Sequence, residues 1–264
     1  MLTLRTVFLR SLAAFVTAFA LLPQSQTAEA APVVPTSTTT PAVAKVASLS
    51  KTTGVEPGVV ATVTRASVTG KNLATTVSVA FGTVSAKLVS VSKSKVTFEV
   101  PALPAGTYRV RVTTAAGTVT GPKYTVRTME SEVLRLTNIA RSKARKCGTV
   151  KYKAAKPLRA DSTLARVALA HSIDMAERSY FSHTSLSGKT PFDRMRAAGY
   201  SYKAAGENIA AGFSTPKAVV DAWLASPGHC RVLMNRAYTE LGVGYSTGGY
   251  YGTYWTQDFG KPKK

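Results

Sequence analysis

The spacing of apolar residues changes near residue 127, and this change constrains the fold more than any other feature of the sequence. Between residues 51 and 127, short runs alternate apolar and polar residues, and glycines or prolines separate the runs. Alternation indicates half-buried strands, and a series of short strands is typical of a β-sandwich. After Arg127 the apolar residues recur with the period of a helix. We therefore predict an all-β domain followed by an α+β domain.

The first domain holds no recognisable catalytic constellation. Its predicted strands cover residues 59–64, 76–81, 86–91, 95–100 and 107–112.

The second domain, predicted over 128–264, begins with a helix at 131–141. A second helix begins near Asp161 or Ser162, either of which can act as its N-cap, and its buried stripe includes His171. Helices at 191–198 and 216–224 each carry proline in the first turn. Strands at 241–245 and 250–259 flank Gly248-Gly249, which predicts a hairpin. Helices followed by an antiparallel pair indicate a layered domain.

The first 30 residues have the pattern of a secretory signal peptide. Arg5 and Arg10 precede an apolar run at 11–22, and Ala28-Glu29-Ala30 offers small residues for cleavage after Ala30. No later stretch is apolar for long enough to span a membrane. Residues 31–50 are rich in Ala, Pro, Thr and Ser and are predicted to form a disordered linker. We expect the mature protein outside the cytoplasm, secreted or associated with the cell envelope.

The charge and the cysteines are consistent with that location. The formal net charge of +21 favours anionic surroundings such as wall polymer or lipid head groups, whereas no motif for dedicated nucleic-acid binding is present. Cys147 and Cys230 are the chain's two cysteines, and in an oxidising compartment an even number favours one disulfide.

All three histidines lie in the second domain. His183, Glu207 and His229 are predicted on three separate loops. Two imidazoles and a carboxylate are the side chains of a divalent-metal site with an open position, or of an acid/base pair with an orienting partner. Histidines in loops near glycines are also often ordinary turn residues whose hydrogen bonds are satisfied locally. His171 lies on an apolar helical stripe and is interpreted as a core residue.

Four motifs in this half of the chain resemble the CAP superfamily of SCP-like domains. They are His171-Ser172-x-Asp174-Met175-Ala176 with Tyr180-Phe181-Ser182-His183; Gly206-Glu207-Asn208-Ile209-Ala210; Trp223-Leu224-x-Ser226-Pro227-Gly228-His229 with Thr239-Glu240-Leu241-Gly242-Val243-Gly244; and Tyr254-Trp255-Thr256-Gln257-Asp258-Phe259-Gly260. The first domain resembles the IPT/TIG family of immunoglobulin-like domains through residues 68–73, 79–82 and 100–108.

The CAP resemblance implies an α-β-α sandwich with a cleft that binds a divalent metal in some members. His183, Glu207 and His229 match three of the four cleft positions of eukaryotic members, and Ser226 stands where those members have a glutamate. The missing carboxylate weakens the expected metal site, whose ion would be zinc or calcium. Relatives with cysteines like Cys147 and Cys230 support the disulfide. The IPT/TIG resemblance implies a spacer or adhesion module.

Three functions stay open at this point. The first is a cleft that binds a ligand through His183, Glu207 and His229, with a divalent ion as a further expectation. The second is a hydrolase in which the ion or Glu207 activates water. The third is adhesion to anionic wall polymer with a vestigial cleft. Ser226 as a nucleophile lacks a base and an acid placed for it by the sequence.

Other acidic and aromatic residues near the end of the domain are assigned structural roles. Glu240 and Asp258 are interpreted as strand-flank residues with local hydrogen bonds. Tyr254, Trp255 and Phe259 are expected to be buried.

Overall fold

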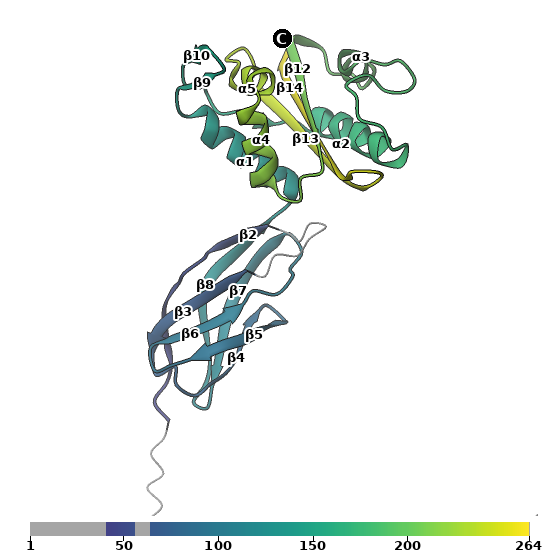
Figure 1. The fold of residues 1–264 in the computed structure, drawn as a ribbon. Helices are drawn as coiled ribbons and strands as arrows, with labels where there is room; N and C mark the ends of the chain where they lie inside the picture. Colours follow the sequence, from purple (N-terminus) through teal and green to yellow (C-terminus); the bar gives the residue numbers. More distant parts are fainter. Residues whose placement is uncertain (1–40, 56–63, 264) are drawn as a thin grey trace, which may run out of the picture. The chain divides into compact units, whose positions relative to one another are not determined.

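The computed structural model describes residues 41–55 and 64–263, so the predicted signal peptide at 1–30 lies outside them, as does most of the strand predicted at 59–64. The first domain is an antiparallel β-sandwich with one short parallel strand at an edge (Figure 1). Its strands are β1 (Lys45–Leu49), β2 (Thr53–Val55), β3 (Arg65–Lys71), β4 (Thr76–Phe81), β5 (Val84–Val91), β6 (Lys95–Glu99), β7 (Gly106–Thr114) and β8 (Gly117–Arg127).

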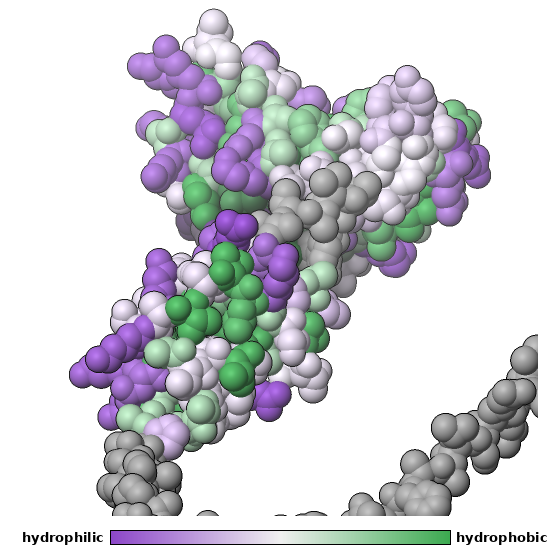
Figure 2. Space-filling model, turned by 60° about the horizontal axis from the view of Figure 1, so that its bottom comes forward, coloured by the Kyte–Doolittle hydropathy of each residue, from purple (hydrophilic) through white to green (hydrophobic). Residues whose placement is uncertain are grey.

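Strand β5 connects the two layers of the sandwich. Its first half pairs with β4 and its second half with β6, which gives the strand order β1-β3-β6-β5-β4-β7-β8-β2. Val68, Phe81 and Phe98 are fully buried between the layers. Hydrophobic residues also reach the surface of this domain between hydrophilic ones (Figure 2), and the exposed valines of β4 and β5 include Val77 and Val89.

The prediction of a disordered linker over 31–50 was wrong for its last residues. Lys45–Leu49 form strand β1, which pairs with β3 in an antiparallel register that places Leu49 opposite Val68. Ala44 and Leu49 are buried in the sandwich core. Pairing with an existing strand orders a segment whose own apolar surface is too small to do so alone.

The second domain is an α+β sandwich, as predicted. Its elements are α1 (Met129–Arg141), β9 (Arg145–Cys147), β10 (Val150–Tyr152), β11 (Arg159–Ala160), α2 (Ser162–Glu177), α3 (Pro191–Ala197), β12 (Tyr202–Ala211), α4 (Pro216–Ala225), α5 (Pro227–Met234), β13 (Glu240–Gly248) and β14 (Gly252–Pro262). The central sheet has the order β11-β13-β14-β12.

Helices cover both faces of this sheet (Figure 1). On one face, α1, α4 and α5 share a core with side chains such as Trp223, Trp255 and Phe259. On the other face, α2 lies against β13 and β14, where a Cβ at Gly242 would stand 2.0 Å from the carbonyl carbon of Leu164. Only a glycine leaves room for a helix backbone this close to a strand. Among the described residues, no helix is both long and apolar enough to cross a bilayer.

Five elements of this domain were not predicted: the short strands β9, β10 and β11, and two longer elements that carry residues of the proposed site. Strand β12 contains Glu207, which the sequence placed on a loop, and helix α5 contains His229, which was placed beyond a helix end. Neither segment has the regular spacing of apolar residues that predicts a strand or a helix. Strand β12 reads Tyr-Lys-Ala-Ala-Gly-Glu-Asn-Ile-Ala-Ala. Helix α5 begins directly after Ser226, which the sequence indicated to be a turn. The predicted hairpin is present, with Tyr250 and Tyr251 in its turn.

The disulfide between Cys147 and Cys230 is formed, with a Cα–Cα distance of 5.4 Å. It connects β9 to α5, and both cysteines are buried in the core of the second domain. Cys230 follows His229 directly, so the bond fixes the helix that carries this histidine.

Candidate functional site

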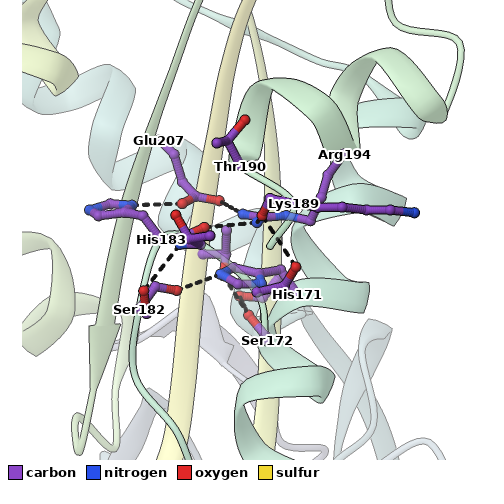
Figure 3. A network of polar contacts seen from close by, with 12 residues as sticks. His171, Ser172, Ser182, His183, Lys189, Thr190, Arg194 and Glu207 are labelled. Carbon is purple, nitrogen blue, oxygen red and sulfur yellow. Dashed lines mark hydrogen bonds and ion pairs between the residues drawn. The ribbon is translucent and has the colours of Figure 1, made fainter. Parts of the chain in front are cut away.

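Glu207 is a nearly completely buried carboxylate on the edge strand β12. Its side chain is 2% exposed, and each oxygen has a donor. Oε1 lies 2.7 Å from Nδ1 of His183, and Oε2 lies 2.5 Å from Nη2 of Arg194 (Figure 3). A buried carboxylate is tolerated only when it is paired and hydrogen-bonded in this way.

Arg194 holds the loop that carries His183. It lies on helix α3, which begins at a capping box formed by Thr190 and Asp193. Besides pairing with Glu207, its Nη1 donates to the carbonyl oxygens of His183 at 2.8 Å and Lys189 at 3.1 Å. Its side chain is only 12% exposed. One guanidinium therefore connects α3, both ends of the 183–189 loop and the buried carboxylate.

His183 has one ring nitrogen that is hydrogen-bonded and one that forms no hydrogen bond with a described residue, so the second can face a ligand. Because the Glu207 carboxylate can only accept, Nδ1 of His183 carries the proton of the 2.7 Å bond. The other nitrogen, Nε2, is then an acceptor when the ring is neutral. The side chain is half exposed. A carboxylate that fixes the tautomer and orientation of an exposed imidazole is the usual support of a histidine that binds a ligand or accepts a proton.

His229 reaches the same region from the opposite layer. Its Nδ1 lies 2.8 Å from Oγ of Ser226, and its backbone oxygen accepts a hydrogen bond from Asn208 of β12 at 3.2 Å. The ring is half-buried, and its pKa is lowered first by burial and then by the nearby His183. The two histidines therefore approach one another at the edge strand, one from the α2–α3 loop and one from α5.

His171 is buried, as predicted for a core residue, but it also supports the site. Its Nε2 donates to the carbonyl oxygen of Ser182 at 2.9 Å, which fixes the residue before His183 (Figure 3). Burial is the main cause of its lowered pKa. A neutral ring with the proton on Nε2 fits this bond.

Asp258 and Glu240 differ from each other in their surroundings. Asp258, on β14, lies directly opposite Glu207 in the sheet register and is completely buried, so its interpretation as a strand-flank residue with local hydrogen bonds was wrong. Burial, and next the Glu207 carboxylate, raise its pKa well above the usual range. Glu240 instead accepts hydrogen bonds from Arg159 and Tyr200. The aromatic residues of β14, Tyr254, Trp255 and Phe259, are buried as predicted.

The donor set does not fit a three-ligand metal site. No three His, Cys, Asp or Glu side chains within 41–55 and 64–263 are grouped as such a site requires. Glu207 gives one oxygen to His183 and the other to Arg194, whose positive charge would oppose a cation at that carboxylate. Metal binding by His183, His229 and Glu207 stays a prediction.

Arg194 is the residue of the site that sequence reasoning missed. It lies two residues before a second arginine in Asp193-Arg194-Met195-Arg196, and nothing in the sequence pattern distinguishes it from Arg196, which pairs with Asp193. Only the capping box, which starts the helix and hence orients its first turn, could have indicated that Arg194 faces the sheet.

Comparison with known proteins agrees with both domains. The sequence model of the cysteine-rich secretory protein family, CAP, matches residues 134–259, and that of the IPT/TIG domain matches residues 50–126. Among curated proteins, the chain is 42% identical over 142 residues to the uncharacterized protein YkwD of Bacillus subtilis, and 40% identical over 132 residues to the uncharacterized membrane protein YlbC of the same organism. The matches cover 54% and 50% of this chain, and 51% and 34% of those proteins.

Solved structures resemble the chain as well. An outer surface protein of Borrelia burgdorferi is 28% identical with a TM-score of 0.41, covering 50% of this chain and 89% of that one. An extracellular protein with an SCP domain from Bacillus anthracis is 25% identical with a TM-score of 0.44, covering 75% and 77%. On the family matches, residues 50–126 of the chain are an IPT/TIG domain, and its C-terminal domain belongs to the cysteine-rich secretory protein (CAP) family.

Proposed function

We propose that this chain is an exported protein that binds a polar ligand at the edge of its CAP domain, with the imidazoles of His183 and His229 as the ligand-binding groups. The observation that carries the proposal is the bond between Glu207 and Nδ1 of His183, which directs the free Nε2 of an exposed ring to act as an acceptor. Export rests on the pattern of the first 30 residues and on the disulfide, which is typical of oxidising compartments.

The charges of the site favour a ligand that donates hydrogen bonds to neutral imidazole. Glu207 and Arg194 compensate one another, so the buried part of the site carries no net charge from this pair. Burial and His183 lower the pKa of His229, which keeps its ring neutral at neutral pH. Binding through His229 should therefore weaken in acid, below the ordinary histidine pKa of about 6.5, as this ring takes up a proton.

Binding of soluble fragments of bacterial cell wall, measured by calorimetry, tests the proposal. The double substitution His183→Gln/His229→Gln should weaken binding at least about tenfold, which corresponds to the loss of about one good hydrogen bond at each ring. Ser226→Ala is the matched control, because it removes the partner of His229 but leaves both imidazoles. Equal binding by the wild type and the double variant would refute the proposal. If added salt releases the wall fragments equally from the wild type and from the double variant, adhesion through the net charge of +21 explains the binding better.

Hydrolysis is the second candidate, and one observation favours it. A carboxylate-oriented imidazole with an exposed Nε2 is also the arrangement of a general base that activates water. The same wall fragments, followed by mass spectrometry, would show cleavage that His183→Gln abolishes while the domain stays folded. Intact fragments after prolonged incubation would exclude this activity on them.

A zinc titration of the wild type and of His183→Gln/His229→Gln tests separately whether the site binds a metal. A metal held by the histidines would bind to the wild type and not to the double variant.

A further inference from the structure

An exposed group of aromatic rings lies beside the loop that leads to His183. Phe181, Tyr250 and Tyr251, called here the aromatic platform, have 44%, 83% and 46% of their surface exposed. The ring centroids of Phe181 and Tyr251 are 5.9 Å apart, and those of Tyr250 and Tyr251 are 5.1 Å apart. Both pairs meet edge to face, with angles of 65° and 88° between the ring planes. The three rings are thus one contiguous, angled surface built from the α2–α3 loop and the β13–β14 turn.

The turn is built to hold these tyrosines in place. Gly248, Gly249 and Gly252 have positive φ angles, a conformation that favours glycine. A Cβ at Gly249 would stand 2.4 Å from the carbonyl oxygen of Ala176, so the turn is seated on the end of α2. Tyr251 also contacts the fully buried Tyr254, with ring centroids 5.9 Å apart. The turn therefore holds Tyr250 and Tyr251 in fixed positions. Their exposed surface contributes little to the stability of the fold, which leaves it available to a partner.

The charge around the platform indicates what kind of partner it fits. The turn reads Ser246-Thr247-Gly248-Gly249-Tyr250-Tyr251-Gly252-Thr253 and contains no charged residue, although the chain has 34 lysines and arginines. Arg178, at the end of α2, is paired with Asp174 at 3.0 Å. A surface that recognised an anionic polymer or an anionic membrane would be expected to carry cations here. Neutral aromatic faces beside the exposed Thr247 and the partly exposed Ser246 suit instead the flat, partly apolar face of a sugar ring.

We infer that the aromatic platform stacks the sugar rings of a neutral glycan chain, extending the ligand site at His183. The inference rests on the proposed function for that extension, because Phe181 precedes His183 by only two residues and so connects the platform to the imidazole. Successive glycan rings would stack on the separate, angled faces of Tyr250, Tyr251 and Phe181, and hydroxyl groups further along the glycan would donate to Nε2 of His183.

Calorimetric binding of chitohexaose to the mature chain tests the inference. Tyr250→Ala/Tyr251→Ala should weaken binding about tenfold or more, because removing one aromatic ring that stacks on the ligand changes the affinity roughly two- to twelvefold. Tyr250→Leu/Tyr251→Leu keeps apolar area but no ring faces, and should weaken binding similarly. The high exposure of Tyr250 leaves the fold intact, which thermal unfolding of each variant checks.

Further outcomes distinguish glycan stacking from a membrane contact, and the aromatic platform from its extension to His183. Absence of chitohexaose binding by the wild type, or equal binding by the alanine double variant, would overturn the inference. So would binding to phosphatidylglycerol vesicles that the alanine variant loses and the leucine variant keeps, since that result identifies a membrane contact. If His183→Gln/His229→Gln binds chitohexaose as the wild type does while the alanine variant does not, the platform stands and its extension to the imidazoles fails.

Discussion

Replacing Arg194 with methionine removes the cation that compensates the buried Glu207. The substitution deletes the 2.5 Å bond to Glu207 and the bonds to the carbonyl oxygens of His183 and Lys189. Breaking a fully buried pair costs about 3–5 kcal/mol because a charge is left without its partner. Arg194 retains 12% exposure and Glu207 keeps its bond to His183, so we expect the lower end, about 3 kcal/mol.

The assay can isolate this domain from the β-sandwich. Both tryptophans of the chain, Trp223 and Trp255, are buried in the CAP domain, so their fluorescence during urea unfolding reports on that domain. For a domain of this size, a loss of about 3 kcal/mol lowers Tm by roughly 10 °C. Arg194→Met/Glu207→Gln should be less destabilised than the sum of the two single variants, because no uncompensated charge remains.

Arg196→Met is the matched control for this prediction. Arg196 lies on the same helix, but its side chain is 59% exposed and it pairs with the exposed Asp193. Its replacement should cost less than about 1 kcal/mol, as exposed ion pairs usually do. Equal effects of Arg194→Met and Arg196→Met would refute the reasoning that the buried pair organises the site.

Three further predictions concern the packing and ionisation of the domain. Cys147→Ala/Cys230→Ala should lower its free energy of unfolding by about 4 kcal/mol, since the disulfide closes a loop with a sequence separation of 83; tryptophan fluorescence during urea unfolding measures it, and an unchanged midpoint would contradict it. Gly242→Ala should cost about 3 kcal/mol, because the added Cβ would stand 2.0 Å from a backbone atom of α2; a thermal melt within a degree of the wild type would show that the helix can move. Burial raises the pKa of Asp258 in the fold, so the stability from its protonated form is complete below the unfolded pKa of about 3.9 and is lost as pH rises through the folded pKa. Asp258→Asn should therefore stabilise the domain more at about pH 8 than at about pH 4, and a difference in unfolding free energy that is independent of pH would contradict the raised pKa.

The parts of the fold that were predictable are those with regular spacing or a cap. The strand at 76–81 agrees with β4, and Asp161 is the N-cap of α2, accepting a hydrogen bond from the backbone of Leu164. Strand β12 was missed because Ala204, Ala205 and Gly206 give it no alternation of large apolar and polar residues. Its strand conformation comes from pairing with β14 along its length. That pairing is a tertiary contact, which local spacing does not record.

The residues that belong to recognisable motifs could be predicted from the sequence, and the residues that support them could not. His183, Glu207 and His229 belong to motifs, and their residue types indicate chemistry by themselves. Arg194 and Asp258 act through burial and proximity to Glu207, properties that depend on the register of β12 with β14 and on the placement of α3. An arginine or aspartate in isolation carries no signal of being buried, so these roles follow only from the three-dimensional arrangement.

The tautomer of His183 is the most direct test of the site. The chain has three histidines, so a long-range ¹H–¹⁵N correlation spectrum of the imidazoles can be assigned with single substitutions. At a pH where the rings are neutral, the bond to Glu207 predicts the proton of His183 on Nδ1, and the bond to Ser182 predicts that of His171 on Nε2. Glu207→Gln should change the ¹H–¹⁵N correlations of the His183 ring and leave those of the other two histidines unchanged. A His183 ring that carries its proton on Nε2 in the wild type would contradict the account, because Glu207 would then not orient it.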